Sequence, residues 1–204
     1  MSKYTTLEQH ASYGIGLQMG QQLADNPFEG LDIDAVAAGV IAAFTEQTPE
    51  VSDEQIRAAF TVISERMQAE QAEKAELLAE AGEAFLAEKD MRTDITVTDS
   101  GLLYEVMVAA EGEKPTRNST VRTHYHGTLI DGTVFDSSYQ RGEPAEFPVS
   151  GVIAGWTEAL QLMSPGSKLR LYIPHNLAYG ERGAGNAIAP FSALIFDVEL
   201  LAIL

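Results

Sequence analysis

VRTHYHGTLIDGTVFDSS, residues 121–138, is the stretch that decides the fold of the second half of this chain. Residues 121, 123 and 125 are apolar or suited to a strand interior, and they alternate with Arg122, His124 and His126. That period of two predicts a half-buried β-strand. The pair Asp131-Gly132 lies between two strand-like runs, which is a strong hairpin signal. The segment is therefore expected to form two antiparallel strands joined by a tight turn.

The residues around this hairpin predict an α+β domain. Further alternating runs indicate strands at 102–108, 168–173 and 194–200, and one short helix is expected at 155–163, ending before Pro165-Gly166. An antiparallel sheet of about five strands, wrapped on one short helix, accounts for this pattern.

The first half of the chain differs in kind, because six of the eight prolines and eleven of the 17 glycines follow residue 92. Apolar spacing predicts helices at 6–24 and 34–44 and a long one from about 52 to 89. Ser52 and Gln55 form a capping-box pattern at the start of the long helix. Its middle, 68–76, is almost wholly polar, which is typical of a stalk through solvent. We therefore expect an N-terminal helical dimerisation domain at 1–50, a connecting helix at 51–92 and the β domain at 93–204.

The N-terminal helices carry more apolar residues than about 60 residues can bury alone. Self-association, most often as a two-fold dimer, is the expected remedy. The alternative is a small helical module that folds back on the second domain.

Composition excludes several classes of function. The net charge of −17 disfavours a nucleic-acid partner, and the lack of cysteine excludes disulfides, thiolate metal sites and cysteine nucleophiles. No apolar run approaches the roughly 18 residues of a membrane span, so no membrane partner is expected. Residues 1–9, MSKYTTLEQ, show no apolar leader. A cytoplasmic protein is the simple expectation, or a periplasmic one if a signal peptide has been removed.

No metal or covalent chemistry stands out, and no cofactor is expected. His124 and His126 share a strand face, but no third ligand is evident and exposed histidines are more common than a metal pair. The glycine-rich segment 180–185 lacks the Lys-Ser/Thr of a phosphate loop.

Aromatic residues do stand out, because they fall in different elements of one small domain. They are Tyr125, Phe135, Phe147, Trp156, Tyr179 and Phe196. Such residues either form an ordinary core or line an apolar pocket.

Four motifs in this half resemble the signature of FKBP-type peptidyl-prolyl cis-trans isomerases. They are residues 121–138, Val152-Ile153-Ala154-Gly155-Trp156, Leu177-Ala178-Tyr179-Gly180 and residues 194–200 (LIFDVEL), in family order and spacing. The N-terminal SYGIGLQMGQQL (12–23) and the long helix resemble the two-domain bacterial members of the FklB and macrophage-infectivity-potentiator kind.

The resemblance implies the residues of the site. Tyr125, Asp136 and Tyr179 would be the catalytic polar groups. The substrate pocket would be lined by Phe135, Phe147, Val152, Ile153, Trp156, Ile188 and Phe196. The Trp156 indole would form the floor under the proline ring, and the Ile153 N–H and Tyr179 hydroxyl would contact carbonyls of the peptide.

The resemblance also implies the activity: rotation about X–Pro bonds of unfolded or nascent polypeptides, without metal or cofactor, and client binding by the N-terminal helices of a homodimer. Macrolides such as tacrolimus or rapamycin are candidate ligands. The alternative is a non-catalytic holdase chaperone or scaffold with a vestigial pocket.

Overall fold

The computed structural model describes residues 3–25 and 27–204, which form two compact units, Met1–Glu70 and Gln71–Leu204. The boundary lies inside the long helix α3, Asp53–Asp90. The second half of α3 therefore belongs to the C-terminal unit.

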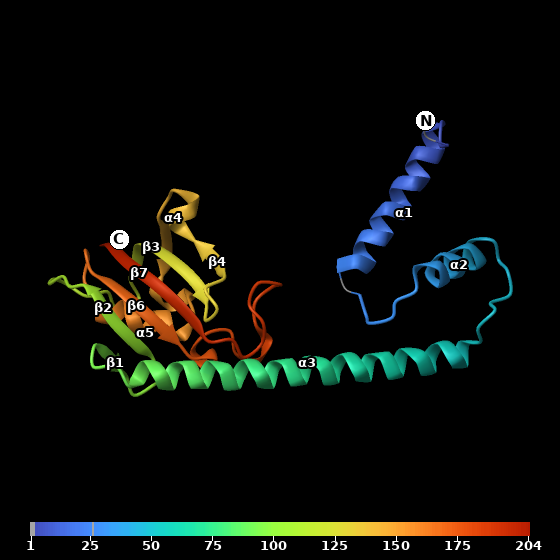
Figure 1. Cartoon of the computed structure of the whole chain (residues 1–204). Helices are drawn as coiled ribbons and strands as arrows, with labels where there is room; N and C mark the ends of the chain where they lie inside the picture. The colour runs from blue at the N-terminus through green and yellow to red at the C-terminus, as the bar shows by residue number, and fades with distance from the viewer. Residues whose placement is uncertain (1–2, 26) are drawn as a thin grey trace. The chain divides into compact units, whose positions relative to one another are not determined.

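The N-terminal unit consists of α1 (Leu7–Asp25), α2 (Ile33–Phe44) and the first half of α3 (Figure 1). The Asp32 carboxylate caps α2 by accepting the N–H groups of Asp34 and Ala35. The predicted capping box at α3 is confirmed, because Ser52 N–H donates to Gln55 Oε1 at 3.1 Å and Gln55 N–H donates to Ser52 Oγ at 3.3 Å. Such caps satisfy backbone donors that a helix start leaves unpaired.

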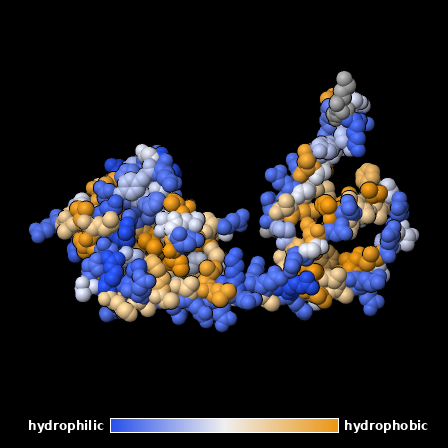
Figure 2. All heavy atoms as spheres, in the orientation of Figure 1, coloured by the Kyte–Doolittle hydropathy of each residue, from blue (hydrophilic) through white to orange (hydrophobic). Residues whose placement is uncertain are grey.

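The apolar side chains of this unit remain on its surface. Neither α1 nor α2 contains a buried residue. Phe44 is 88% exposed and Phe60, on α3, is 67% exposed. Figure 2 shows hydrophobic residues on the surface of these helices. A single copy of the unit thus lacks a hydrophobic core of its own.

The C-terminal unit is built on one antiparallel sheet of seven strands in the order β1-β2-β6-β7-β3-β4, with β5 also paired to β3 (Figure 1). The strands are β1 (Ile95–Val97), β2 (Leu103–Val108), β3 (Thr120–Leu129), β4 (Val134–Ser137), β5 (Ala145–Pro148), β6 (Lys168–Ile173) and β7 (Leu194–Ile203). The predicted hairpin is β3–β4, and Gly132 N–H donates to Leu129 O in its turn at 3.0 Å. β4 and β5 pair with successive parts of β3, and the short helix α4 (Ser138–Arg141) lies between them in the chain.

Helix α5 (Ala154–Leu162) packs on one face of the sheet. It contributes Trp156, Ala159 and Leu160 to a hydrophobic core that also contains inward-facing residues of β3, β6 and β7. Along β3 the buried residues alternate with less buried ones. The period-two pattern of the sequence thus sets which side chains face α5.

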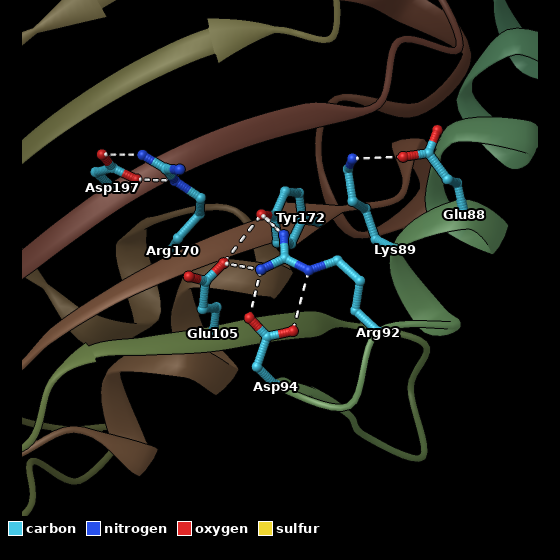
Figure 3. A network of polar contacts seen from close by, with 8 residues as sticks. All are labelled: Glu88, Lys89, Arg92, Asp94, Glu105, Arg170, Tyr172 and Asp197. Atoms are coloured by element: carbon cyan, nitrogen blue, oxygen red, sulfur yellow. Dashed lines mark hydrogen bonds and ion pairs between the residues drawn. The ribbon is translucent and has the colours of Figure 1, made fainter.

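The loop that follows α3 is joined to the opposite face of the sheet by a network of polar contacts (Figure 3). Arg92 donates to both oxygens of Asp94 and also pairs with Glu105 on β2 at 3.3 Å. Arg170 on β6 makes a two-pronged ion pair with Asp197 on β7. Phe85 contacts the ring of Tyr172 at 5.9 Å. These residues, with Lys89, His126, Thr128 and Ile195, line a hollow of about 440 Å³.

The predicted α+β class is confirmed, with a helical N-terminal region, a long helix and an antiparallel sheet on one short helix. The sheet has seven strands rather than about five. The additional β1 and β5 have three and four residues, too few to produce a recognisable period of two.

Candidate active site

The indole of Trp156, on α5, lies at the centre of an aromatic cluster. Its ring contacts those of Tyr125 (β3), Phe147 (β5) and Phe196 (β7) at centroid distances of 5.2, 5.8 and 5.2 Å, all close to edge-to-face. Phe135, on β4, packs edge-on against Phe196 at 5.3 Å. Such edge-to-face pairs add about 0.5–1.5 kcal/mol each beyond burial. Five elements of the fold thus meet in one apolar cluster.

Two glycines allow this cluster to form. A Cβ on Gly127 would lie 2.7 Å from Phe135 Cζ and 2.7 Å from Phe196 Cε1, so both rings fold directly over the strand backbone. A Cβ on Gly155 would lie 2.7 Å from Ile173 Cγ2, so α5 sits directly on β6. The residue next to Gly155 is Trp156, whose side chain is only 4% exposed. The close packing of α5 on β6 therefore places the indole in the interior of the C-terminal unit.

A polar group of three side chains lies beside the aromatic cluster. The Tyr125 hydroxyl donates to Asp136 Oδ2 at 2.6 Å, and Arg141 Nη2 donates to the Tyr125 oxygen at 2.8 Å. Arg141 Nη1 also pairs with Asp136 Oδ1. Tyr125 thus belongs to both groups, with its ring on Trp156 and its hydroxyl on Asp136.

The environment moves the pKa values of this group in opposite directions. Burial raises the pKa of Tyr125, and its hydrogen bond to Asp136 raises it further. Burial also opposes ionisation of Asp136, but the hydrogen bonds from Tyr125 and Arg141 outweigh it, so the pKa of Asp136 lies below its ordinary value. Hence Asp136 is a carboxylate and Tyr125 a neutral hydroxyl near neutral pH.

Arg141 and Ser138 are parts of the site that sequence reasoning missed. Both belong to α4, which is capped by Ser137 and ends at Gly142, where the backbone is left-handed with φ 77°. The buried Ser138 hydroxyl accepts the Tyr125 N–H at 2.7 Å. The sequence offers one signal for this part of the site, an arginine five residues after Asp136. A helix of only four residues is too short to show a hydrophobic period, so the pattern did not predict α4.

The segment between β6 and β7 holds the remaining predicted residues. Ile188 is buried in the core cluster and pairs through its backbone with Ala184. Tyr179 is 40% exposed, and none of the described residues is a hydrogen-bond partner of its hydroxyl.

The structure brings most of the predicted site residues together. Eight of them belong to, or pack against, one hydrophobic cluster: Tyr125, Phe135, Phe147, Val152, Ile153, Trp156, Ile188 and Phe196. Asp136 joins this cluster through Tyr125, whereas Tyr179 stands outside it at the surface.

The two histidines lie on the other face of β3. His124 Nδ1 and His126 Nδ1 are 3.0 and 3.1 Å from the hydroxyls of Ser138 and Ser137. Within residues 3–25 and 27–204, no three His, Asp or Glu side chains gather closely enough to hold a metal ion. These histidines support the β4–α4 turn.

Comparison with known proteins agrees with this geometry. Residues 111–201 match the family model described as FKBP-type peptidyl-prolyl cis-trans isomerase, and residues 8–106 match the domain amino-terminal to it. The chain is 51% identical to the FKBP-type 22 kDa peptidyl-prolyl cis-trans isomerase of Escherichia coli K12, over 98% of both proteins. This chain belongs to the FKBP family of peptidyl-prolyl cis-trans isomerases. The predicted family and enzyme class are confirmed.

Two further relatives extend the FKBP match to the two-unit architecture. The crystal structure of FkpA from Escherichia coli superposes with a TM-score of 0.71 and 35% identity, covering 98% of each chain. The outer membrane protein MIP of Legionella longbeachae is 38% identical over 98% of this chain and 87% of its own length. Similarity to FKBP proteins therefore includes the helical first half.

The close approach at Gly127 predicts a clear effect of added volume. We expect Gly127→Ala to lower the free energy of unfolding by about 2 kcal/mol, because Phe135 and Phe196 must leave their positions over the strand. Urea unfolding followed by Trp156 fluorescence measures this. Thr128→Ala, at the next position on the outer face, serves as control. Equal stability of Gly127→Ala and the wild type would show that the rings tolerate a Cβ there.

The pKa of Asp136 predicts a pH dependence. Because that pKa is lower in the folded chain than the ordinary 3.8, the carboxylate stabilises the fold above about pH 3.8, and this contribution disappears as the pH falls through the folded-state value. Asp136→Asn should therefore have a lower Tm than the wild type at about pH 7 and a smaller difference at about pH 2. Thermal unfolding by circular dichroism tests this. A Tm difference that does not change with pH would contradict it.

Proposed function

We propose that the chain catalyses cis–trans rotation about X–Pro bonds of unfolded and folding proteins at the aromatic cluster around Trp156. The observation that carries the proposal is the indole of Trp156, enclosed by three rings beside the Tyr125–Asp136–Arg141 group, in a member of the FKBP family. The proline ring of the substrate binds against this cluster, and Phe135, Phe147, Val152, Ile153, Ile188 and Phe196 surround it.

The apolar character of the site explains how rotation is accelerated. The barrier of about 18–20 kcal/mol comes from the amide resonance that is lost on rotation. The planar amide is charge-separated and well hydrated, whereas the twisted transition state is less polar. An aromatic site therefore binds the twisted form better than the planar form, which is differential binding without a nucleophile.

Hydrogen-bond donors at the edge of the site add to this preference. The Tyr179 hydroxyl and the Ile153 N–H, which precedes α5, have no partners among the described residues. Both are available to the carbonyl oxygens of a bound peptide, which lowers the barrier when the contact is stronger in the twisted state. Asp136 and Arg141 fix the Tyr125 hydroxyl and so hold its ring against Trp156.

A second copy of the chain supplies the core that the N-terminal unit lacks. The support is the absence of buried residues in α1 and α2 and the strong exposure of Phe44 and Phe60. We propose a homodimer through these helices, with the remaining apolar surface binding unfolded clients. No specific observation favours the non-catalytic holdase over the isomerase.

The sequence leaves two cellular locations open, the cytoplasm and the periplasm. One relative is named an outer membrane protein, which favours the periplasmic alternative over the cytoplasm. In the described part of the chain, no helix is long and apolar enough to cross a membrane.

Catalysis is tested with a protein whose refolding is limited by proline isomerisation. We expect the wild type to accelerate refolding at well below stoichiometric amounts, and Trp156→Phe and Asp136→Ala each to reduce kcat/KM about tenfold or more. Tyr139→Phe is the control and should be unaffected, because the Tyr139 hydroxyl donates to Glu199 and its ring stacks on His124, on the face of the sheet opposite Trp156. Competition by rapamycin tests whether macrolides share the site. Slower refolding without turnover by the wild type would support the holdase instead.

The division of labour is tested with a fragment starting at Gln71, the first residue of the C-terminal unit. The fragment should retain isomerisation of a short peptide but lose efficiency on an unfolded protein, since client binding is assigned to the N-terminal helices. In sedimentation the full chain should have twice the mass of one copy and the fragment the mass of one. A monomeric full chain, or equal loss on both substrates, would contradict this division.

A further inference from the structure

Gly82 is the buried residue of the 38-residue helix α3. A Cβ built on it would lie 3.2 Å from Ala193 Cβ, which is tighter than ordinary van der Waals contact, and 3.7 Å from Ala193 N, which is an ordinary contact. Glycine in a helix interior costs about 1 kcal/mol relative to alanine. The close approach gives a physical reason for glycine at this position, because the helix backbone rests directly on Ala193.

Ala193 is the last residue of the segment 174–193, which joins β6 to β7. The base of this segment is closed by hydrogen bonds: Phe191 N–H donates to Gly180 O at 2.9 Å, and Ser192 Oγ donates to Ala189 O at 2.8 Å. Phe191 has a φ of 60°, which is unfavourable for a bulky residue and persists only where the surroundings hold it. The base of the segment is therefore fixed in one conformation.

The tip of the same segment is also tightly packed. Ala184 and Ile188 exchange backbone hydrogen bonds of 2.8 and 3.1 Å. A Cβ on Gly183 would lie only 2.2 Å from Ile188 O. A displacement at Ala193 is thus passed to Tyr179, through Gly180, and to Ile188, rather than being absorbed by a flexible loop.

We propose that Gly82 is a positioning residue for the isomerase reaction: it lets α3 rest on Ala193 and thereby fixes segment 174–193, which carries Tyr179 and Ile188, at the substrate site. The inference depends on the proposed function, which assigns these two residues to substrate binding. It adds α3, a helix that contributes no side chain to the site, to the elements that determine substrate affinity.

The test is a rescue experiment on the full chain with a short X–Pro peptide. Gly82→Ala should raise KM roughly three- to tenfold with little change in kcat, because the added methyl group displaces Ala193. Helix propensity alone would make this variant more stable, so an unchanged or higher Tm together with a raised KM separates positioning from a loss of fold. Removing the opposing methyl group in Gly82→Ala/Ala193→Gly should return KM to near the wild-type value.

Two controls make the result decisive. Glu83→Ala changes the next, exposed position of α3 and should retain the wild-type KM. Ala193→Gly alone is the reference against which the KM of the double variant is compared. Wild-type KM in Gly82→Ala, or a raised KM that Ala193→Gly does not relieve, overturns the inference. If Gly82→Ala does not fold, the double variant decides. A folded double variant with the wild-type KM supports the inference, and a folded double variant with a raised KM overturns it. An inactive wild type would contradict the proposed function instead.

Discussion

The edge-to-face packing of three rings around the Trp156 indole is the interaction on which the C-terminal unit depends. Those rings come from β3, β5 and β7, so the cluster forms only when the sheet has its native order. It also requires α5 to sit directly on β6, which Gly155 allows. The core of the fold and the proposed site are therefore largely the same set of side chains.

The polar groups have a different role. Tyr125, Asp136 and Arg141 satisfy one another at the edge of the apolar cluster, so the Tyr125 hydroxyl has partners where burial would otherwise be costly. On the opposite face of the sheet, Arg92, in the loop after α3, pairs with Glu105 on β2, and Arg170 on β6 pairs with Asp197 on β7. One face of the sheet thus forms the apolar cluster with α5, and the other face packs against the C-terminal part of α3.

Local sequence chemistry was sufficient for the hairpin, the capping box and the long helices. Asp131-Gly132 specifies a turn, and Ser52 and Gln55 specify a helix start, whatever the rest of the chain does. Pattern alone could not decide whether the aromatic residues form a core or a pocket, and the structure shows why: Trp156 and Phe196 are core residues that also belong to the proposed site. The family resemblance supplied the assignment, and the comparisons support the family.

The parts that were missed depend on contacts between distant residues. Arg141 reaches Tyr125 because α4 turns the chain between β4 and β5, and Ala193 meets Gly82 from 111 positions away along the chain. Neither contact leaves a periodic signal in the sequence. The exposure of the N-terminal apolar residues was foreseeable from composition, but the second copy proposed to cover them is outside a single chain.

The most direct measurement of the central claim uses the indole N–H of Trp156, the single tryptophan of the chain. Its nitrogen–proton resonance is unique, and a proline-containing peptide can be titrated while nuclear Overhauser effects are recorded. Binding at the aromatic cluster predicts a shift of this resonance and contacts from the proline ring protons to the indole. A peptide that is turned over while the Trp156 resonance stays in place and shows no contact to the proline ring would contradict the account.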